Sequence, residues 1–299
     1  MGYRIGFDIG STTIKAVVLD GNNQICYKSY ERHKAQVRQK ALDKLVELKK
    51  YTKEPFKFAI SGSGALGLCE QGELPFVQEV FASATGVSKL YPETDCAIEL
   101  GGEDAKILFF QGSVEQRMNS TCAGGTGAFI DQMATLLNMS LEEMNEASLN
   151  YHRLYPIASR CGVFAKTDIQ PLINQGVDKC DLCASIFQAV VDQTITSLAQ
   201  GRKIEGNILF LGGPLYFLSG LRKRFVETLK LSDAQVNCPE TAINFVALGT
   251  AICADQEYTY DELYKALEDL VHAPAKLTES KPLFESEEDY QKFIERHKS

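Results

Sequence analysis

Hydrophobic and polar positions alternate over short runs at the start of the chain, which is typical of strands. The segment 3–8 has the alternation of a half-buried strand, and a second apolar run occupies 14–19. The turn sequence DGNN then leads into a third run at 24–30. The pattern predicts a meander of three strands.

Longer segments with helical spacing alternate with further apolar runs, so the chain is predicted to be an α/β protein. Helices are expected at 35–51, 75–90, 127–138, 181–198, 220–229 and 241–254, the last rich in small residues suited to tight packing. Short buried strands are expected at 56–60, 96–100 and 207–211. From residue 255 onward the chain is charged and aromatic with little periodicity, and no element is predicted there.

Two stretches of the chain have the same pattern, FDIGSTTIKAVVLDG at 7–21 and IELGGEDAKILFFQG at 98–112. In each, an apolar run ends in a carboxylate, and a glycine turn and a second apolar run follow. Shifting the first stretch by 91 positions places Asp8 on Glu99, Gly10 on Gly101, Lys15 on Lys106 and Gly21 on Gly112. The repeat predicts a second meander that extends to about residue 117.

The glycine turns suggest a phosphate site, because glycine lets backbone N–H groups approach a phosphate closely. The candidate contacts are Gly10, Ser11, Thr12 and Thr13 in the first loop and Gly101 and Gly102 in the second, with Lys15 as a counter-charge. Magnesium prefers oxygen ligands and keeps several waters, so Asp8, Glu99 and Asp104 are predicted to hold it indirectly.

A third glycine loop, formed by Gly212, Gly213 and Pro214 after a buried strand, is a candidate for the nucleoside. Glu103 or Asp104 is expected to orient an attacking water. One such turn is usually only a tight turn, but two in register and a third loop favour a nucleotide site between two halves of the molecule.

Composition narrows the class of protein. The 299 residues suffice for two domains, and the 44% hydrophobic and 23% charged contents are ordinary for a soluble globular protein. A net charge of −8 gives no basic surface for nucleic acid, and we find no uninterrupted apolar run that predicts a membrane span and no signal peptide. A cytoplasmic protein is expected. Nine scattered cysteines favour metal or redox use of some of them over a secreted disulfide framework.

Two cysteines precede predicted helices, Cys122 in MNSTCAGGTGAFIDQM and Cys161 in IASRCGVFAKTDIQPL. A helix N-terminus lowers the pKa of a thiol, and a thiolate there is ready to bind metal. A cubane iron–sulfur cluster needs about four thiolates, so a two-fold dimer could hold one on its axis. The alternative is that each is an ordinary buried thiol.

The remaining cysteines and histidines receive no functional role. Cys180 and Cys183 form a C-x-x-C pair with no second pair nearby, which favours a structural role. The other cysteines lie mostly in apolar segments, as expected of core residues. The four histidines share no spacing typical of a metal site or triad, so surface or loop positions are expected for them.

The phosphate loops resemble those of the actin, hexokinase and Hsp70 superfamily, with DIGSTT as the first phosphate motif, ELGGED as the second and LGGP as the adenosine motif. The resemblance implies two ribonuclease-H-like domains, 1–90 and 91–254, with ATP in the cleft between them and a charged extension at 255–299. The helix at 241–254 is expected to pack back on the first domain. Aspartate is the usual residue in the superfamily at the position of Glu99.

The combination of DIGSTT, GGED, CAGGTG and a cysteine followed by VFA resembles the BadF/BadG/BcrA/BcrD ATPase family, and within it the activators of 2-hydroxyacyl-CoA dehydratases, over roughly residues 3 to 254. The resemblance implies a homodimer with one bridging [4Fe-4S] cluster, held by Cys122 and Cys161 of each subunit. It also implies ATP-driven transfer of a low-potential electron from a donor such as ferredoxin or flavodoxin to a dehydratase or reductase. The loop residues Gly124, Gly125, Thr126 and Gly127 would lie beside the cluster and reach the nucleotide.

Two other functions remain open, a small-molecule kinase such as a sugar or pantothenate kinase, and a regulatory ATPase of the Hsp70 or actin type. A kinase needs a general base for its acceptor, and the sequence offers no clear one. The segments ERHKAQVR, LPFVQEV and FLGGPLYFLSGLRKRF resemble the N-terminal part of very large fused activator-like proteins. This likeness and the uncapped end IERHKS predict a fragment of a longer chain.

Overall fold

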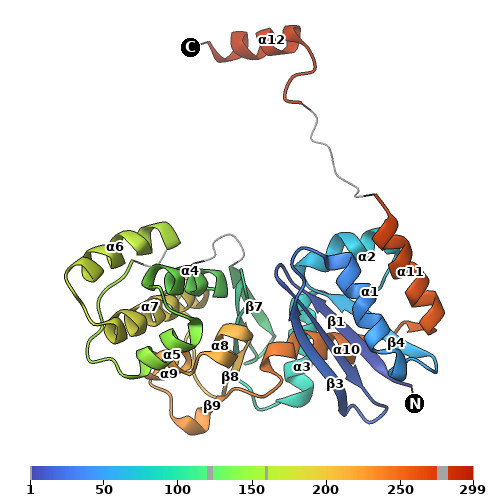
Figure 1. Cartoon of the computed structure of the whole chain (residues 1–299), viewed down its shortest axis with the longest axis horizontal. Helices are drawn as coiled ribbons and strands as arrows, with labels where there is room; N and C mark the ends of the chain where they lie inside the picture. Colours follow the sequence, from blue (N-terminus) through green and yellow to red (C-terminus); the bar gives the residue numbers. More distant parts are fainter. Residues whose placement is uncertain (1, 120–123, 159–160, 275–281, 299) are drawn as a thin grey trace.

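The computed structural model describes residues 2–119, 124–158, 161–274 and 282–298, and these residues form two five-stranded mixed sheets with helices packed on them (Figure 1). The first sheet has the order β3-β2-β1-β4-β10, with β1 (Arg4–Ile9), β2 (Thr13–Leu19), β3 (Ile25–Arg32), β4 (Phe56–Ser61) and β10 (Glu257–Tyr258). The second has the order β7-β6-β5-β8-β9, with β5 (Cys96–Leu100), β6 (Ala105–Phe109), β7 (Glu115–Asn119), β8 (Ile208–Leu211) and β9 (Val236–Asn237).

The two sheets repeat one arrangement of strands, as the sequence repeat predicts. In each, three strands form an antiparallel meander, and a later strand pairs in parallel with the first strand of the meander. The register places Asp8 opposite Lys15 in one sheet and Glu99 opposite Lys106 in the other. Each meander therefore carries a carboxylate and a lysine as a cross-strand pair beside its glycine turn.

The helices of the described residues follow the predicted order with shifted ends. They are α1 (Val37–Glu47), α2 (Leu66–Gly72), α3 (Glu79–Leu90), α4 (Gly127–Leu137), α5 (Leu141–Leu149), α6 (Gly162–Asn174), α7 (Lys179–Thr194), α8 (Gly213–Phe217), α9 (Ser219–Leu229), α10 (Phe245–Cys253), α11 (Tyr260–His272) and α12 (Glu287–His297). With the turn that follows α7, Lys179–Ala199 is the one helix among the described residues long and apolar enough to cross a membrane; about two thirds of it is buried, as in the core helix of a globular protein.

The predicted helix at 75–90 begins four residues late. The Ile60 backbone N–H donates to the Pro75 carbonyl at 2.9 Å, and the Val77 N–H donates to the Ile60 carbonyl at 2.8 Å, so this stretch runs beside β4 instead. Proline carries no N–H and is compatible with such an edge. The consequence is that Glu79 lies in the first turn of α3.

Helices α3 and α10 lie between the two sheets (Figure 1). Helix α10 packs on α3 and on strands of the first sheet, while the same apolar cluster includes Ala97, Leu108 and Leu211 of the second sheet. The approach is close, because a Cβ on Gly249 would overlap the carbonyl oxygen of Ala82, and one on Gly6 would overlap the α10 backbone. Small residues are required at this contact.

The interpretation that residues after 255 lack periodicity is wrong for α11. Leu263, Leu267 and Leu270 form a buried stripe that packs with α1 and joins the core of the first sheet. A capping box between Thr259 and Glu262 starts the helix. The stripe escaped notice because charged residues fill the rest of the helix surface.

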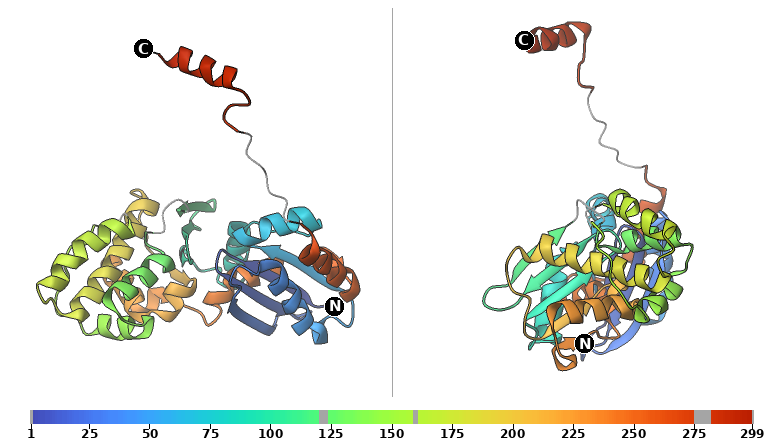
Figure 2. Two further views of the ribbon diagram at one scale, coloured as in Figure 1. Left: turned by 45° about the horizontal axis from the view of Figure 1, so that its top comes forward. Right: turned by 90° about the vertical axis from the view of Figure 1, so that its left-hand side faces the viewer.

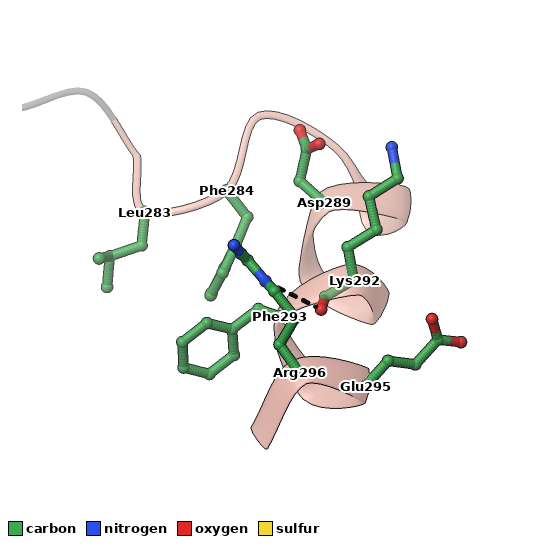
Figure 3. Close-up of a pocket in the computed structure, with 7 residues that line it drawn as sticks. All are labelled: Leu283, Phe284, Asp289, Lys292, Phe293, Glu295 and Arg296. Atoms are coloured by element: carbon green, nitrogen blue, oxygen red, sulfur yellow. Dashed lines mark hydrogen bonds between the residues drawn. The ribbon is translucent and has the colours of Figure 1, made fainter. Parts of the chain in front are cut away.

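Helix α12 lies away from both sheets in Figures 1 and 2 and buries none of its own residues. The ring of Phe284 packs on Tyr290 and Phe293, with centroids 5.2 and 5.3 Å apart. Figure 3 shows a pocket formed there by Leu283, Phe284, Asp289, Lys292, Phe293, Glu295 and Arg296. No residue predicted to bind nucleotide lines this pocket.

We expect Leu267→Ala to lower the free energy of unfolding by about 2–5 kcal/mol, because it removes a leucine that is only 1% exposed. The control Leu283→Ala, at a side chain that is 94% exposed, should leave it unchanged. Urea titration measures both. Equal stability of the two variants would show that α11 does not belong to the core of the first sheet.

Candidate functional site

The first glycine loop joins β1 to β2. The Gly10 N–H donates to the Thr13 carbonyl at 3.0 Å, which closes the turn and leaves Ser11 and Thr12 exposed at its tip. Thr13 is buried at the start of β2. The exposed tip offers hydroxyl and backbone groups to a ligand.

The second loop joins β5 to β6 and meets the first. The Gly101 N–H donates to the Asp104 carbonyl at 2.8 Å, the same closure as in the first loop. A Cβ on Gly102 would lie 3.2 Å from Oγ1 of Thr12, so the two loops face each other across the boundary between the halves. Glu103 is exposed on this loop.

The N-terminus of α4 is bonded to the second loop. The Gly127 and Ala128 N–H groups donate to the Gly101 and Gly102 carbonyls at 3.0 and 2.8 Å. A Cβ on Gly127 would lie 3.4 Å from Cγ of Pro214, so the third glycine loop converges on the same place. The positive end of a helix therefore faces this point.

The other predicted loop residues take different places. Gly124, Gly125 and Thr126 are buried, and Gly125 lies with φ of +86° beside Gln193 and Thr194 of α7. Gly212 has φ of +87°, and a Cβ there would overlap the Leu100 carbonyl, so glycine is required where the third loop crosses the second sheet. The next residue, Gly213, begins α8.

The first carboxylate is paired within its own meander. Nζ of Lys15 lies 2.7 Å from Oδ2 of Asp8, whose side chain is only 2% exposed. Burial alone would lower the pKa of Lys15, but the Asp8 charge raises it above its ordinary value. The predicted counter-charge for a phosphate is thus engaged by Asp8.

The second pair is part of a larger charge cluster around buried Lys106. Its Nζ lies 2.7 Å from Oδ2 of Asp104 and 3.4 Å from Oε1 of Glu99, and it also bonds Oε1 of Glu79. Burial alone would lower the pKa of Lys106, but these carboxylates raise it well above the usual value. Ser83 of α3 donates to the other Glu99 oxygen at 3.1 Å.

Glu79 is a site residue that the sequence analysis missed. Burial and the nearby carboxylates of Asp8, Glu99 and Asp104 raise its pKa to about 7, although the Lys106 ammonium opposes the shift. The predicted helix placed Glu79 in its interior rather than at its start. The available signal was the proline at residue 75, which permits an extended stretch before α3.

The two predicted cluster ligands differ in what the structure describes. Cys161 is the N-cap residue of α6 and is half-buried, and its carbonyl accepts the first helical hydrogen bond from Ala165 at 2.9 Å. Cys122 lies outside the described residues. Beside Cys161, the apolar side chains of Val163 and Phe164 are 65% and 64% exposed.

No group of three or more histidine, cysteine or acidic residues in the described part of the chain is arranged to hold a metal ion. Cys183 is buried with Sγ 3.8 Å from Sδ of Met139, and burial raises its pKa to about 12. This supports a core role for it. The expected surface or loop position is wrong for His33, which is buried beside the first glycine loop.

Replacement of Glu79 by glutamine should change how stability depends on pH. A carboxyl whose pKa rises from 4.5 in the unfolded chain to about 7 binds more protons when folded, so its contribution to stability is lost as pH rises through this window. The advantage of Glu79→Gln over the native protein should therefore grow by up to ~3 kcal/mol between pH 4.5 and 8. Urea titrations across this range measure it, with exposed Glu93→Gln as the control. A constant difference would contradict the electrostatic environment described here.

Comparison with known proteins follows from this geometry. The chain is 30% identical over 258 residues to the activator of lactoyl-CoA dehydratase of Anaerotignum propionicum, covering 84% of this chain and 97% of the relative. It is 27% identical over 215 residues to the (R)-2-hydroxyglutaryl-CoA dehydratase activating ATPase of Acidaminococcus fermentans, covering 71% and 82%.

Solved structures agree with these relatives. Component A of the Acidaminococcus fermentans (R)-2-hydroxyglutaryl-CoA dehydratase superposes with a TM-score of 0.74 at 25% identity, over 90% of this chain and all of that one. The activator of the 2-hydroxyisocaproyl-CoA dehydratase from Clostridium difficile, with bound ADPNP, has the same score and identity over 92% of this chain and all of that one. These neighbours confirm the predicted two-domain α/β fold of the actin type. The model of the BadF/BadG/BcrA/BcrD ATPase family matches residues 5–254, and the chain therefore belongs to this family of ATPases.

Proposed function

We propose that this protein couples ATP hydrolysis to the transfer of a low-potential electron to a partner enzyme that acts on a CoA thioester, in the cytoplasm. The observation that carries the proposal is the pair of hydrogen bonds from the N-terminus of α4 to the Gly101 and Gly102 carbonyls. They join the second glycine loop to the segment that begins at Cys122. A change at the nucleotide can thus reach the predicted cluster ligands through one helix.

The nucleotide is assigned to the three converging loops. Backbone groups of the first two loops and of 124–127 would hold the phosphates, and Gly212, Gly213 and Pro214 would contact the nucleoside. Asp8, Glu99 and Asp104 would hold Mg²⁺ through water, which agrees with the lack of a direct metal-chelating group among the described residues. Glu103 or Asp104 would orient the attacking water.

The cluster is assigned to Cys122 and Cys161 of two subunits. Cys161 at the start of α6 has the helix-terminal position that favours a thiolate. Within the described residues one chain offers no set of three donors, so a second copy of the chain would complete the site. A [4Fe-4S] cluster supplies one-electron transfer when bound. The exposed Val163 and Phe164 would help exclude water from the interface between subunits.

The partner is inferred from the relatives, which are activators of CoA dehydratases and include one component of the benzoyl-CoA reductase of Thauera aromatica. We therefore propose a dehydratase or reductase as the electron acceptor. A ferredoxin or flavodoxin would be the electron donor.

Cys161→Ser should remove the iron and the broad visible absorbance from protein purified without oxygen, while ADPNP binding stays unchanged. Cys180→Ser, at a half-buried cysteine on α7, is the control and should keep its iron. Iron analysis and calorimetric titration with ADPNP measure the two properties. Iron that persists in Cys161→Ser, or an iron-free native protein, would contradict the cluster assignment.

Asp8→Asn should slow ATP hydrolysis by more than about tenfold, because a loss of only ~1.4 kcal/mol of transition-state stabilisation has this effect. Phosphate release measures the rate, and exposed Asp43→Asn on α1 is the control. An ATP turnover that requires a sugar or pantothenate acceptor would instead support a small-molecule kinase.

A further inference from the structure

His33 is the residue that follows β3, and its ring is buried against the first glycine loop. Only 4% of its surface is exposed. Its Nε2 lies 3.0 Å from the Gly10 carbonyl oxygen, and its backbone N–H donates to the Thr12 carbonyl at 3.2 Å. One residue outside the loop therefore holds two of the loop's carbonyl groups.

The second ring nitrogen is also used. The Ala35 N–H donates to Nδ1 of His33 at 3.2 Å. Both ring contacts are hydrogen bonds only if the ring is neutral, with its proton on Nε2, so that Nδ1 accepts and Nε2 donates to Gly10. The network thus assigns the tautomer.

The turn after His33 is strained. Lys34 and Ala35 have φ of +49° and +61°, a region that side chains other than glycine rarely adopt. The bond from Ala35 to Nδ1 and the bond from the Gln36 N–H to the His33 carbonyl, at 2.8 Å, stabilise this turn. A strained turn retained beside a loop suggests that the ring position matters.

The Gly10 carbonyl is enclosed from a second side. A Cβ on Gly64 would lie 2.7 Å from this oxygen, so the loop after β4 packs there as well. The C=O and N–H of a trans peptide point in opposite directions. With the Gly10 oxygen held toward His33, the N–H of Ser11 is turned away from the ring, toward the exposed tip of the loop.

We propose that His33 is a positioning residue for nucleotide binding, which fixes the Gly10–Ser11 peptide so that its N–H faces the nucleotide phosphates. The inference rests on the proposed nucleotide site and adds to it a residue outside the glycine loops. His33 itself touches no nucleotide and acts through the Gly10 carbonyl.

Two substitutions separate the two ring contacts. Glutamine can place an amide N–H near the position of Nε2 and so keep the bond to Gly10. Asparagine can accept from Ala35 at the position of Nδ1 but is too short to reach Gly10. His33→Asn should therefore keep the turn and lose the bond to the loop, whereas His33→Gln should keep the bond to the loop.

Calorimetric titration of the full chain with Mg²⁺-ADPNP and with adenosine tests the proposal. His33→Asn should weaken ADPNP binding about 5- to 30-fold, the effect of one positioned hydrogen bond, and leave adenosine binding unchanged. His33→Gln should restore ADPNP affinity to within about threefold of the native value. His272→Ala, at an exposed histidine, is the control and should bind both ligands as the native protein does.

The outcomes separate this inference from the proposed function. Native ADPNP affinity in a folded His33→Asn variant, or equal losses for ADPNP and adenosine, would overturn the role of His33 and leave the nucleotide site in place. Failure of the native protein to bind ADPNP would overturn both.

Discussion

The buried ammonium of Lys106 is the interaction on which the arrangement of the site depends. It gathers Glu99 and Asp104 from the second sheet and Glu79 from α3. A buried cation is tolerated only when its charge is compensated, and removing one partner leaves a charge without compensation. Apolar packing presses α3 between the sheets, but this charge cluster fixes which end of the helix meets the second glycine loop.

The two copies of the meander differ in this respect. Asp8 and Lys15 satisfy each other within the first sheet, whereas Glu99 and Lys106 share their pair with residues of α3. Glutamate has one more methylene than the aspartate usual in the superfamily. The greater reach lets one oxygen of Glu99 meet the Ser83 hydroxyl while the other faces Lys106. The unusual residue is thus accounted for by its contact with α3.

Local pattern sufficed for the strands, the repeat and the three glycine loops, because alternation and glycine turns are properties of a few adjacent residues. It did not suffice for Glu79 or His33, whose roles come from residues distant in sequence. Glu79 depends on an extended stretch paired with β4, and His33 on the return of β3 to the first loop. In α11, three leucines among charged residues gave too weak a pattern, and contact with α1 decided the outcome.

The return of β10 and α11 to the first sheet has a consequence for folding during synthesis. Residues 2–90 leave the ribosome without the edge strand beside β4 and without Leu263, Leu267 and Leu270, which complete their core. The whole second sheet is made in between. Contacts between such distant segments form slowly, so the nascent first half must wait with apolar surface exposed. The order of translation therefore makes the earliest part of this chain among the last to be finished.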